Sequence, residues 1–219
     1  MRRASGPAVL CCLLGCAPAT PESGSSGAAA TAPEGAVLLV DGLPLAAAEV
    51  EPLCRDIAEL YPEYSRLHAR RLALTNEFLP RLAAHALDPE RWRRAREACE
   101  ALGDPPRVDG LEPLQREGRF PALGLPLWSV ARHLPEGQWS APIELTGRWL
   151  RLRLDAKEAP GDPLLEKLRI SMLEFPYVDP AQSRAAIEGA IDRAHLTLIA
   201  PEFAEAVPEI WKHRMRGSP

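Results

Sequence analysis

The sequence has no hydrophobic run approaching the roughly 20 residues that a transmembrane helix requires. It also has no excess of positive charge, because 26 Lys and Arg residues stand against 30 Asp and Glu residues, for a formal net charge of −4. No basic stripe occurs along the chain, so we expect no nucleic-acid partner. These absences leave a globular protein whose contact with a membrane would depend on a covalent anchor.

Histidine and cysteine are scarce, with five residues of each. No Cys-x-x-Cys or His-x-x-x-His spacing is present, so we expect neither a metal site nor a cofactor. The histidines share no motif, and we expect each of them at the surface or at a helix end, without a catalytic role. They are His68, His85, His133, His195 and His213.

The first residues show the pattern of an export signal. Arg2 and Arg3 precede the short apolar run 8–14, and small residues surround Cys16. The ending Leu13-Leu14-Gly15-Cys16 resembles the lipobox of bacterial lipoproteins, which implies a signal peptide over 1–15 and acylation of Cys16. The alternative is an ordinary secretory signal that is cut shortly after Cys16. Because no Asp follows Cys16, the resemblance favours the periplasmic face of the outer membrane.

A flexible tether is expected over 16–35, since this stretch has no large apolar side chain that could be buried. Once Cys16 is acylated and the signal is removed, Cys54 and Cys99 are the only cysteines left. In an oxidising compartment this pair is a candidate disulfide. The alternative is two buried thiols on separate helices.

Hydrophobic periodicity predicts a helical N-terminal part. A strand over 37–40, a turn at Asp41-Gly42 and a returning segment 43–45 come first. A helix starting near Val50 follows, and then a longer helix over 64–87 that Pro80 should kink or divide.

Three Asp-Pro pairs are typical helix starts, because the Asp accepts free N–H groups and the Pro fits the first turn. Asp88-Pro89 predicts a helix over 89–102, and Asp179-Pro180 predicts one over 181–195. Asp162-Pro163 predicts the start of a helical C-terminal tail.

The middle of the chain predicts a smaller α+β lobe. Residues 104–127 are rich in Pro and Gly, and a short helix follows over 127–134. Two strands are expected at 143–145 and 148–154, the second alternating Leu with Arg so that one face is buried and the other is exposed to solvent. A last strand is expected at 196–199.

Two pieces of the chain resemble the SurA/parvulin group of exported peptidyl-prolyl isomerases and chaperones. The first is Val37–Leu45 with the helix after it, which is similar to the opening of the family's chaperone domain. The second is Trp128–Leu154, with a loop Gly-x-x-Ser-x-Pro at 137–142 and a strand pair around Gly147. The resemblance implies a mostly helical α+β fold in which N- and C-terminal segments form one chaperone domain, with strand 37–40 paired to strand 196–199.

The chain departs from active parvulins at the positions that matter for catalysis. Trp149 stands where the family has its second His, and no His-Ile-Leu strand opens the lobe. We therefore expect a degenerate parvulin-like lobe without strong isomerase activity. The expected division is a signal at 1–15, a tether at 16–35, a helical chaperone-like part at 36–103, the lobe at 104–160 and a returning C-terminal part at 161–219.

Trp128, Trp139 and Trp149 are the candidate peptide-binding residues, since large rigid rings bury much surface in a groove for apolar chains. The alternative is that they form the core of a small lobe. The leading hypothesis is a lipid-anchored periplasmic chaperone that binds extended exported polypeptides. An active peptidyl-prolyl isomerase and a lipoprotein interaction scaffold are the alternatives.

Overall fold

The computed structural model describes residues 33–103, 106, 112–158, 161–179, 181, 183–213 and 215. All of them belong to one compact unit over 32–219, and the remaining unit, 1–31, contains no described residue. The expected signal peptide, Cys16 and most of the expected tether lie outside the described residues. Within the described ranges, no helix has the length and apolar character to cross a bilayer.

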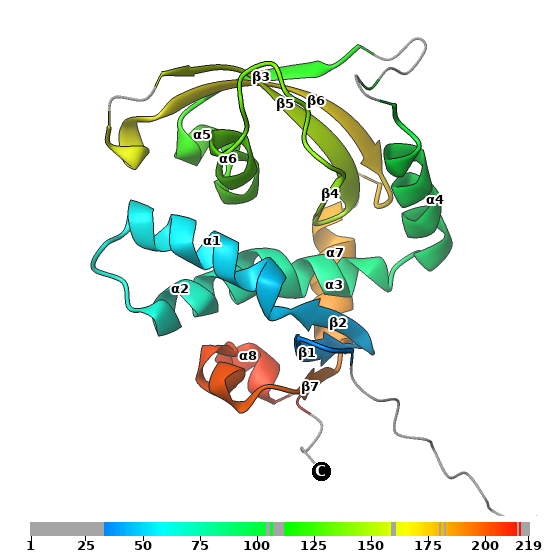
Figure 1. Cartoon of the computed structure of the whole chain (residues 1–219). Helices are drawn as coiled ribbons and strands as arrows, with labels where there is room; N and C mark the ends of the chain where they lie inside the picture. Colours follow the sequence, from blue (N-terminus) through cyan, green and yellow to red (C-terminus); the bar gives the residue numbers. More distant parts are fainter. Residues whose placement is uncertain are drawn as a thin grey trace, which may run out of the picture. The chain divides into compact units, whose positions relative to one another are not determined.

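The described residues form two antiparallel sheets and a set of mostly short helices, so the α+β class is confirmed (Figure 1). One sheet has the order β2-β1-β7 and the other the order β3-β6-β5-β4. The strands are β1 (Ala36–Val40), β2 (Leu43–Ala46), β3 (Leu114–Gly118), β4 (Ile143–Leu145), β5 (Arg148–Glu158), β6 (Lys167–Pro176) and β7 (Leu196–Leu198). The α-helices are α1 (Ala47–Leu60), α2 (Arg66–Ala73), α3 (Leu79–His85), α4 (Pro89–Glu100), α5 (Phe120–Leu123), α6 (Leu125–Arg132), α7 (Ser183–Arg193) and α8 (Glu209–Lys212).

The first sheet joins the two ends of the described chain. Asp41 (φ 48°) and Gly42 (φ 86°) both have positive φ, as a tight two-residue hairpin between β1 and β2 requires. On its other edge β1 pairs with β7, with Leu38 opposite Leu198 and Val40 opposite Leu196. The pairing expected between 37–40 and 196–199 is therefore confirmed.

The helical part packs its apolar stripe against this sheet. α1 buries Val50, Leu53, Cys54 and Ile57, which join the first core with residues of β1, α2, α3 and the 3₁₀ helix η3 (Pro201–Ala206). The helix begins at Ala47, slightly earlier than predicted, and includes Pro52 near its N-terminal end.

The expected long helix over 64–87 is continuous but changes its hydrogen-bonding pattern. A π-helical segment, η1 (Leu74–Phe78), joins α2 to α3, and the Leu79 N–H donates to the Leu74 carbonyl. Pro80 follows directly and has no N–H of its own to donate. We infer that the wider π turn accommodates Pro80 without a break, because such bulges are a common way to absorb a lost helical bond.

The three Asp-Pro pairs have different outcomes. Asp88 caps α4 by accepting the Arg91 N–H at 2.8 Å, and Asp179 accepts the Ala181 N–H just before α7. Asp162 accepts the Leu164 N–H but starts only one 3₁₀ turn, η2 (Pro163–Leu165). The prediction of a helical tail from Asp162 is wrong, because β6 begins at Lys167, two residues after the end of η2.

That strand, β6, is central to the second sheet. It pairs with β5 over its whole length and with β3 on its other side, so the lobe's sheet continues beyond the boundary expected at residue 160. Leu168, Ile170 and Met172 alternate on its buried face. They form the second core with Leu150, Leu152 and Leu154 of β5 and with α5 and α6, which lie on one face of the sheet (Figure 1).

The opposite face of β5 is less exposed than predicted. Arg151 was expected in solvent, but its side chain is covered, with Nε donating to the Ser140 carbonyl at 2.8 Å. Its Nη1 donates to the carbonyls of Leu102 and Gly103. Because a guanidinium presents five donors, it can satisfy the carbonyls of two loops that would otherwise lack partners.

Candidate functional site

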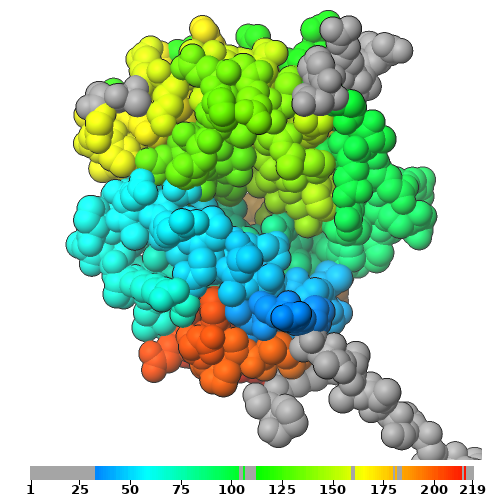
Figure 2. Space-filling view, in the orientation of Figure 1, coloured from blue at the N-terminus to red at the C-terminus, as the bar shows by residue number. Residues whose placement is uncertain are grey.

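A cavity of about 370 Å³ lies between the helical part and the lobe. Its volume is in the range of about 300–1,000 Å³ that is usual for ligand sites. The surface is hollowed at this place, between α1 and the strands of the lobe (Figure 2). Its lining residues are Glu49, Pro52, Leu53, Glu77, Phe78, Arg81, Pro126, Ser129, Val130, Pro142, Ile143, Glu144, Leu145, Thr146 and Trp149.

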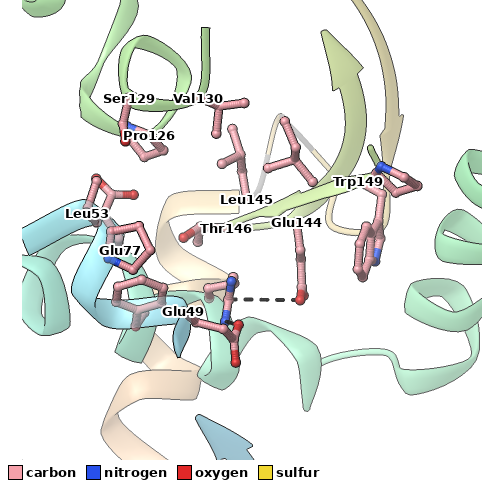
Figure 3. Close-up of a pocket in the computed structure, with 15 residues that line it drawn as sticks. Glu49, Leu53, Glu77, Pro126, Ser129, Val130, Glu144, Leu145, Thr146 and Trp149 are labelled. Atoms are coloured by element: carbon pink, nitrogen blue, oxygen red, sulfur yellow. Dashed lines mark hydrogen bonds and ion pairs between the residues drawn. The ribbon is translucent and has the colours of Figure 1, made fainter. Parts of the chain in front are cut away.

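The walls of this cavity are mainly apolar and come from both sides. Leu53 of α1 lies on the helical wall, facing Val130 of α6 and Leu145 of β4 (Figure 3). Phe78 of η1 also belongs to the lining. Trp149 of β5 stands at the far side. Apolar walls with a few polar groups are typical of sites that bind by burial and select by charge.

The polar part of the cavity centres on Arg81. Its Nη2 lies 2.7 Å from Glu49 Oε2, and its Nε lies 3.9 Å from Glu144 Oε2, the pair marked by the dashed line in Figure 3. Only 14% of the Arg81 side chain is exposed. The guanidinium is therefore held between carboxylates of α1 and β4, one from each side of the cavity.

Glu144 is fixed by further donors. The Trp92 Nε1–H donates to Oε1 at 2.6 Å, and the Tyr177 hydroxyl donates to the same oxygen at 3.1 Å. Burial raises the pKa of Glu144, while Arg81, Trp92 and Tyr177 act in the opposite direction. This carboxyl is a structural anchor for β4 as much as a part of the cavity wall.

Glu77 differs from the other carboxyls of the cavity. Among the described residues, no hydrogen bond or ion pair holds its side chain, and only the charge of Arg81 acts on it at longer range. Burial raises its pKa from 4.5 to about 7. Ionising this carboxyl is therefore costly, because the surrounding side chains shield it from water.

A buried polar network closes one end of the cavity. Ser129 of α6, which lines the cavity, donates its hydroxyl to Asp56 of α1. Asp56 is 2% exposed and lies 3.3 Å from Arg132 Nη1 and 2.8 Å from His133 Nε2. Arg132 also pairs with Glu166 at 3.3 Å. The network joins α1 to α6, and so holds the helical part against the lobe.

Replacing Glu77 with Gln should change how stability depends on pH. A carboxyl whose pKa is raised on folding destabilises the folded state as pH rises from its unfolded pKa of about 4.5 to about 7. We therefore compare the free energies of unfolding of E77Q and the wild type at pH 5 and at pH 8. The difference between them should change by about 2 kcal/mol in favour of E77Q as the pH rises from 5 to 8. Urea denaturation of both proteins at the two pH values measures the difference.

The other charged groups that line the cavity are Arg81, Glu49 and Glu144, and all three are unchanged in this comparison. Glu63→Gln removes a carboxyl from an exposed position and is the matched control, with an expected change within about 0.5 kcal/mol at both pH values. Equal pH profiles for E77Q and wild type would show that Glu77 is solvated as an ordinary carboxyl.

The structure separates the three tryptophans that were predicted to bind peptide. Trp128 is fully buried in the second core, with Phe120 6.0 Å away in an edge-to-face contact. Trp139 is 9% exposed and has the Arg153 guanidinium over its ring at 5.3 Å. Neither ring lines the cavity. Trp128 belongs to the second core and Trp139 is buried beside β5, so for these two residues the structure favours the alternative of a role in the lobe's own core. Trp149 alone of the three lines the cavity.

The predicted cysteine pair is present as two free thiols. Cys54 is buried in the first core and Cys99 is buried near the end of α4. Burial raises the pKa of each thiol to about 11, so both remain protonated and unreactive near neutral pH. The structure therefore has the second of the two alternatives, without the disulfide. Cys16, the predicted lipidation site, lies outside the described residues.

The histidines lie where the sequence places them, at exposed positions or helix ends. Among the described residues that line the cavity there is no His and no Cys. The described ranges also contain no cluster of three or more metal-ligating side chains. The arrangement can bury an apolar segment and offer it carboxyls, and Ser129 and Thr146 add hydroxyls to the lining.

The charged residues of the cavity are not predictable from local sequence patterns. Glu49, Glu77, Arg81 and Glu144 lie on four separate elements, and each looks like a surface residue of its own helix or strand. A weak signal existed in Glu77, which sits beside Phe78 on the apolar stripe of its helix. Comparisons with protein-family models, curated proteins and solved structures find no match to this chain.

Proposed function

We propose that this protein is a lipid-anchored periplasmic chaperone, similar in type to the SurA/parvulin group, that binds extended segments of exported polypeptides. The observation that carries the proposal is the apolar cavity formed jointly by α1, η1, α3, α6, β4 and β5. A site shared by two parts of the fold suits a client chain that enters between them. Acylation at Cys16 would hold this site close to a membrane, where exported chains are still unfolded.

Three features support the likeness in fold to that group. The first and last strands pair in one sheet, so N- and C-terminal segments build one helical part. A small α+β lobe is inserted between them, with a helix, the loop over 137–142 and a strand pair around Gly147, whose φ is 84°. The order of these elements along the chain is the one that the resemblance implies.

The lining of the cavity suits binding of a polypeptide better than isomerisation of an X-Pro bond. The rotation barrier of an X-Pro bond is about 18–20 kcal/mol, and lowering it requires groups placed around the twisted amide. The resemblance places Trp149 where the family has its second His. The Nε1 of Trp149 is buried without a hydrogen-bond partner among the described residues, and the ring lines the cavity. A binding function without strong isomerase activity is the proposal that fits this lining.

Filling the cavity should remove chaperone activity. Val130 is partly buried on α6 and lines the cavity, so Val130→Trp places a large ring inside it. The full chain in detergent should suppress the aggregation of an unfolded outer-membrane protein at equimolar concentration, and V130W should lose most of this effect. Light scattering after dilution from urea measures it.

Ile210 provides the matched control, because it is 56% exposed on α8 and lines no described cavity. Ile210→Trp should keep the wild-type activity. The proposal fails if the wild type does not suppress aggregation at several-fold excess, or if V130W and I210W act alike. Acceleration of X-Pro isomerisation at the rate of an active parvulin, measured on the same preparation, would favour the enzyme instead.

A further inference from the structure

The strongest unexplained feature of the cavity is a carboxyl, that of Glu77, without a hydrogen-bond or ion-pair partner among the described residues. Glu77 shares the lining with two other carboxyls, Glu49 and Glu144, and with one cation, Arg81. Both of those carboxyls already face Arg81, at 2.7 Å and 3.9 Å. No cation of the described chain pairs with Glu77.

This distribution leaves the cavity with an excess of negative charge. Three carboxyls stand against one guanidinium, and Arg81 is oriented toward Glu49 and Glu144. An acidic side chain of a bound chain would meet Glu77 and Glu144 without a free cation to compensate. A basic side chain would find an acceptor in Glu77, and its aliphatic stem would lie along the apolar wall.

The apolar side chains that line the cavity together with Glu77 can contact the residues on either side of the basic residue in a bound chain. Leu53 lies on the same wall as Glu77, while Val130, Leu145 and Trp149 lie across the cavity (Figure 3). Phe78, which follows Glu77 in η1, is a further apolar lining residue. Apolar side chains that flank the basic residue would bury against them. The volume of about 370 Å³ limits the site to a short piece of chain rather than a folded element.

We infer that the cavity selects segments in which a Lys or Arg side chain is flanked by apolar residues, with the carboxylate of Glu77 as the acceptor of the basic group. This inference rests on the proposed binding of extended polypeptides and specifies its clients. An arriving cation also removes the cost of ionising Glu77, because an opposite charge within a few ångströms favours the carboxylate. Binding and ionisation of Glu77 are therefore coupled.

Matched peptides test this selectivity. Short peptides with leucine before and phenylalanine after a central residue are compared, the centre being lysine, norleucine or glutamate. Titration of the full chain in detergent, followed by tryptophan fluorescence and calorimetry, gives each affinity at pH 8. We expect the lysine peptide to bind about tenfold more tightly than the norleucine peptide, since only the lysine ammonium can donate a charge-assisted hydrogen bond to Glu77. The glutamate peptide should bind most weakly.

Glu77→Gln should reduce the preference for lysine over norleucine, measured as the ratio of the two affinities, from about tenfold to less than twofold. Glu63→Gln, with the same loss of charge at an exposed position, should retain the preference. The comparison among peptides on the wild type does not depend on how well E77Q folds. Equal affinities for lysine and norleucine peptides on the wild type would overturn the inference and leave the proposed function standing. Absence of binding for all three peptides would overturn both.

Discussion

Replacing Asp56 with Ala should lower the free energy of unfolding by about 3–5 kcal/mol. Asp56 is 2% exposed and receives Ser129, Arg132 and His133 from α6. Without its carboxylate, the side chain of Arg132, which is 9% exposed, loses a partner on α1 and keeps a largely buried charge. For a chain of this size the loss corresponds to a fall of about 6–20 °C in Tm. Calorimetry and urea denaturation both measure it.

The matched control for this substitution is Glu59→Ala. Glu59 pairs with the same guanidinium at 2.7 Å, but half of its side chain is exposed, so its removal should cost at most about 1 kcal/mol. If the two variants are equally stable, the Asp56 network contributes nothing beyond an ordinary surface pair. If D56A is strongly destabilised, the contact between α1 and α6 is a main connection between the helical part and the lobe.

Replacing Trp128 with Ala should lower the free energy of unfolding by about 3–5 kcal/mol. The indole is fully buried, and its removal leaves a cavity that the sheet and the helices do not fill. Trp128→Phe should cost much less, about 1–2 kcal/mol. The indole Nε1–H is buried without a hydrogen-bond partner among the described residues, so losing it removes a desolvated donor and offsets part of the lost volume. Urea denaturation of both variants gives the ranking.

Binding assays on the same variants separate the two roles that the sequence allowed for Trp128. Because the ring lies in the second core and outside the cavity lining, W128F should suppress aggregation as the wild type does. If W128F has near wild-type stability but does not suppress aggregation, Trp128 contributes to binding of the unfolded protein. The assignment of Trp128 to the core would then be wrong.

Much of the fold could be predicted from local patterns. Asp41-Gly42 can adopt the positive φ values of a tight hairpin, and the spacing of Leu150, Leu152 and Leu154 matches one face of a sheet. Both signals depend only on neighbouring residues. The same holds for Asp88-Pro89 at the start of α4.

The errors came from features that depend on distant parts of the chain. β3 has no apolar periodicity and its Leu114 is 52% exposed, so only its hydrogen bonds to β6 define it as a strand. Asp162-Pro163 gave a helix signal that a single 3₁₀ turn satisfies. The alternation of Leu and Arg in β5 predicts a solvent-exposed Arg151, but its guanidinium donates to the carbonyls of Leu102 and Gly103, which lie 49 and 48 residues earlier in the chain.

The candidate site was the least predictable part, since its residues meet only after the two parts of the fold pack together. Glu77 and Glu144 belong to different parts, and neither stands in a recognisable motif. The tryptophans are conspicuous in the sequence because aromatic residues are rare in it, but Trp128 and Trp139 are buried in the lobe. The polar groups of the cavity follow from tertiary packing, which a single sequence does not reveal.

The pairing of β1 with β7 has a consequence for how the chain reaches its folded state. Residues 36–40 find one of their two sheet partners only when residues 196–198 have arrived, and Phe203, Ala206 and Val207 complete the core beside them. Contacts between such distant residues carry a large loop-closure cost before they stabilise anything, so this sheet should form late and slowly. During synthesis, the apolar surface of the N-terminal helices would stay partly uncovered until residues 196–207 have been released.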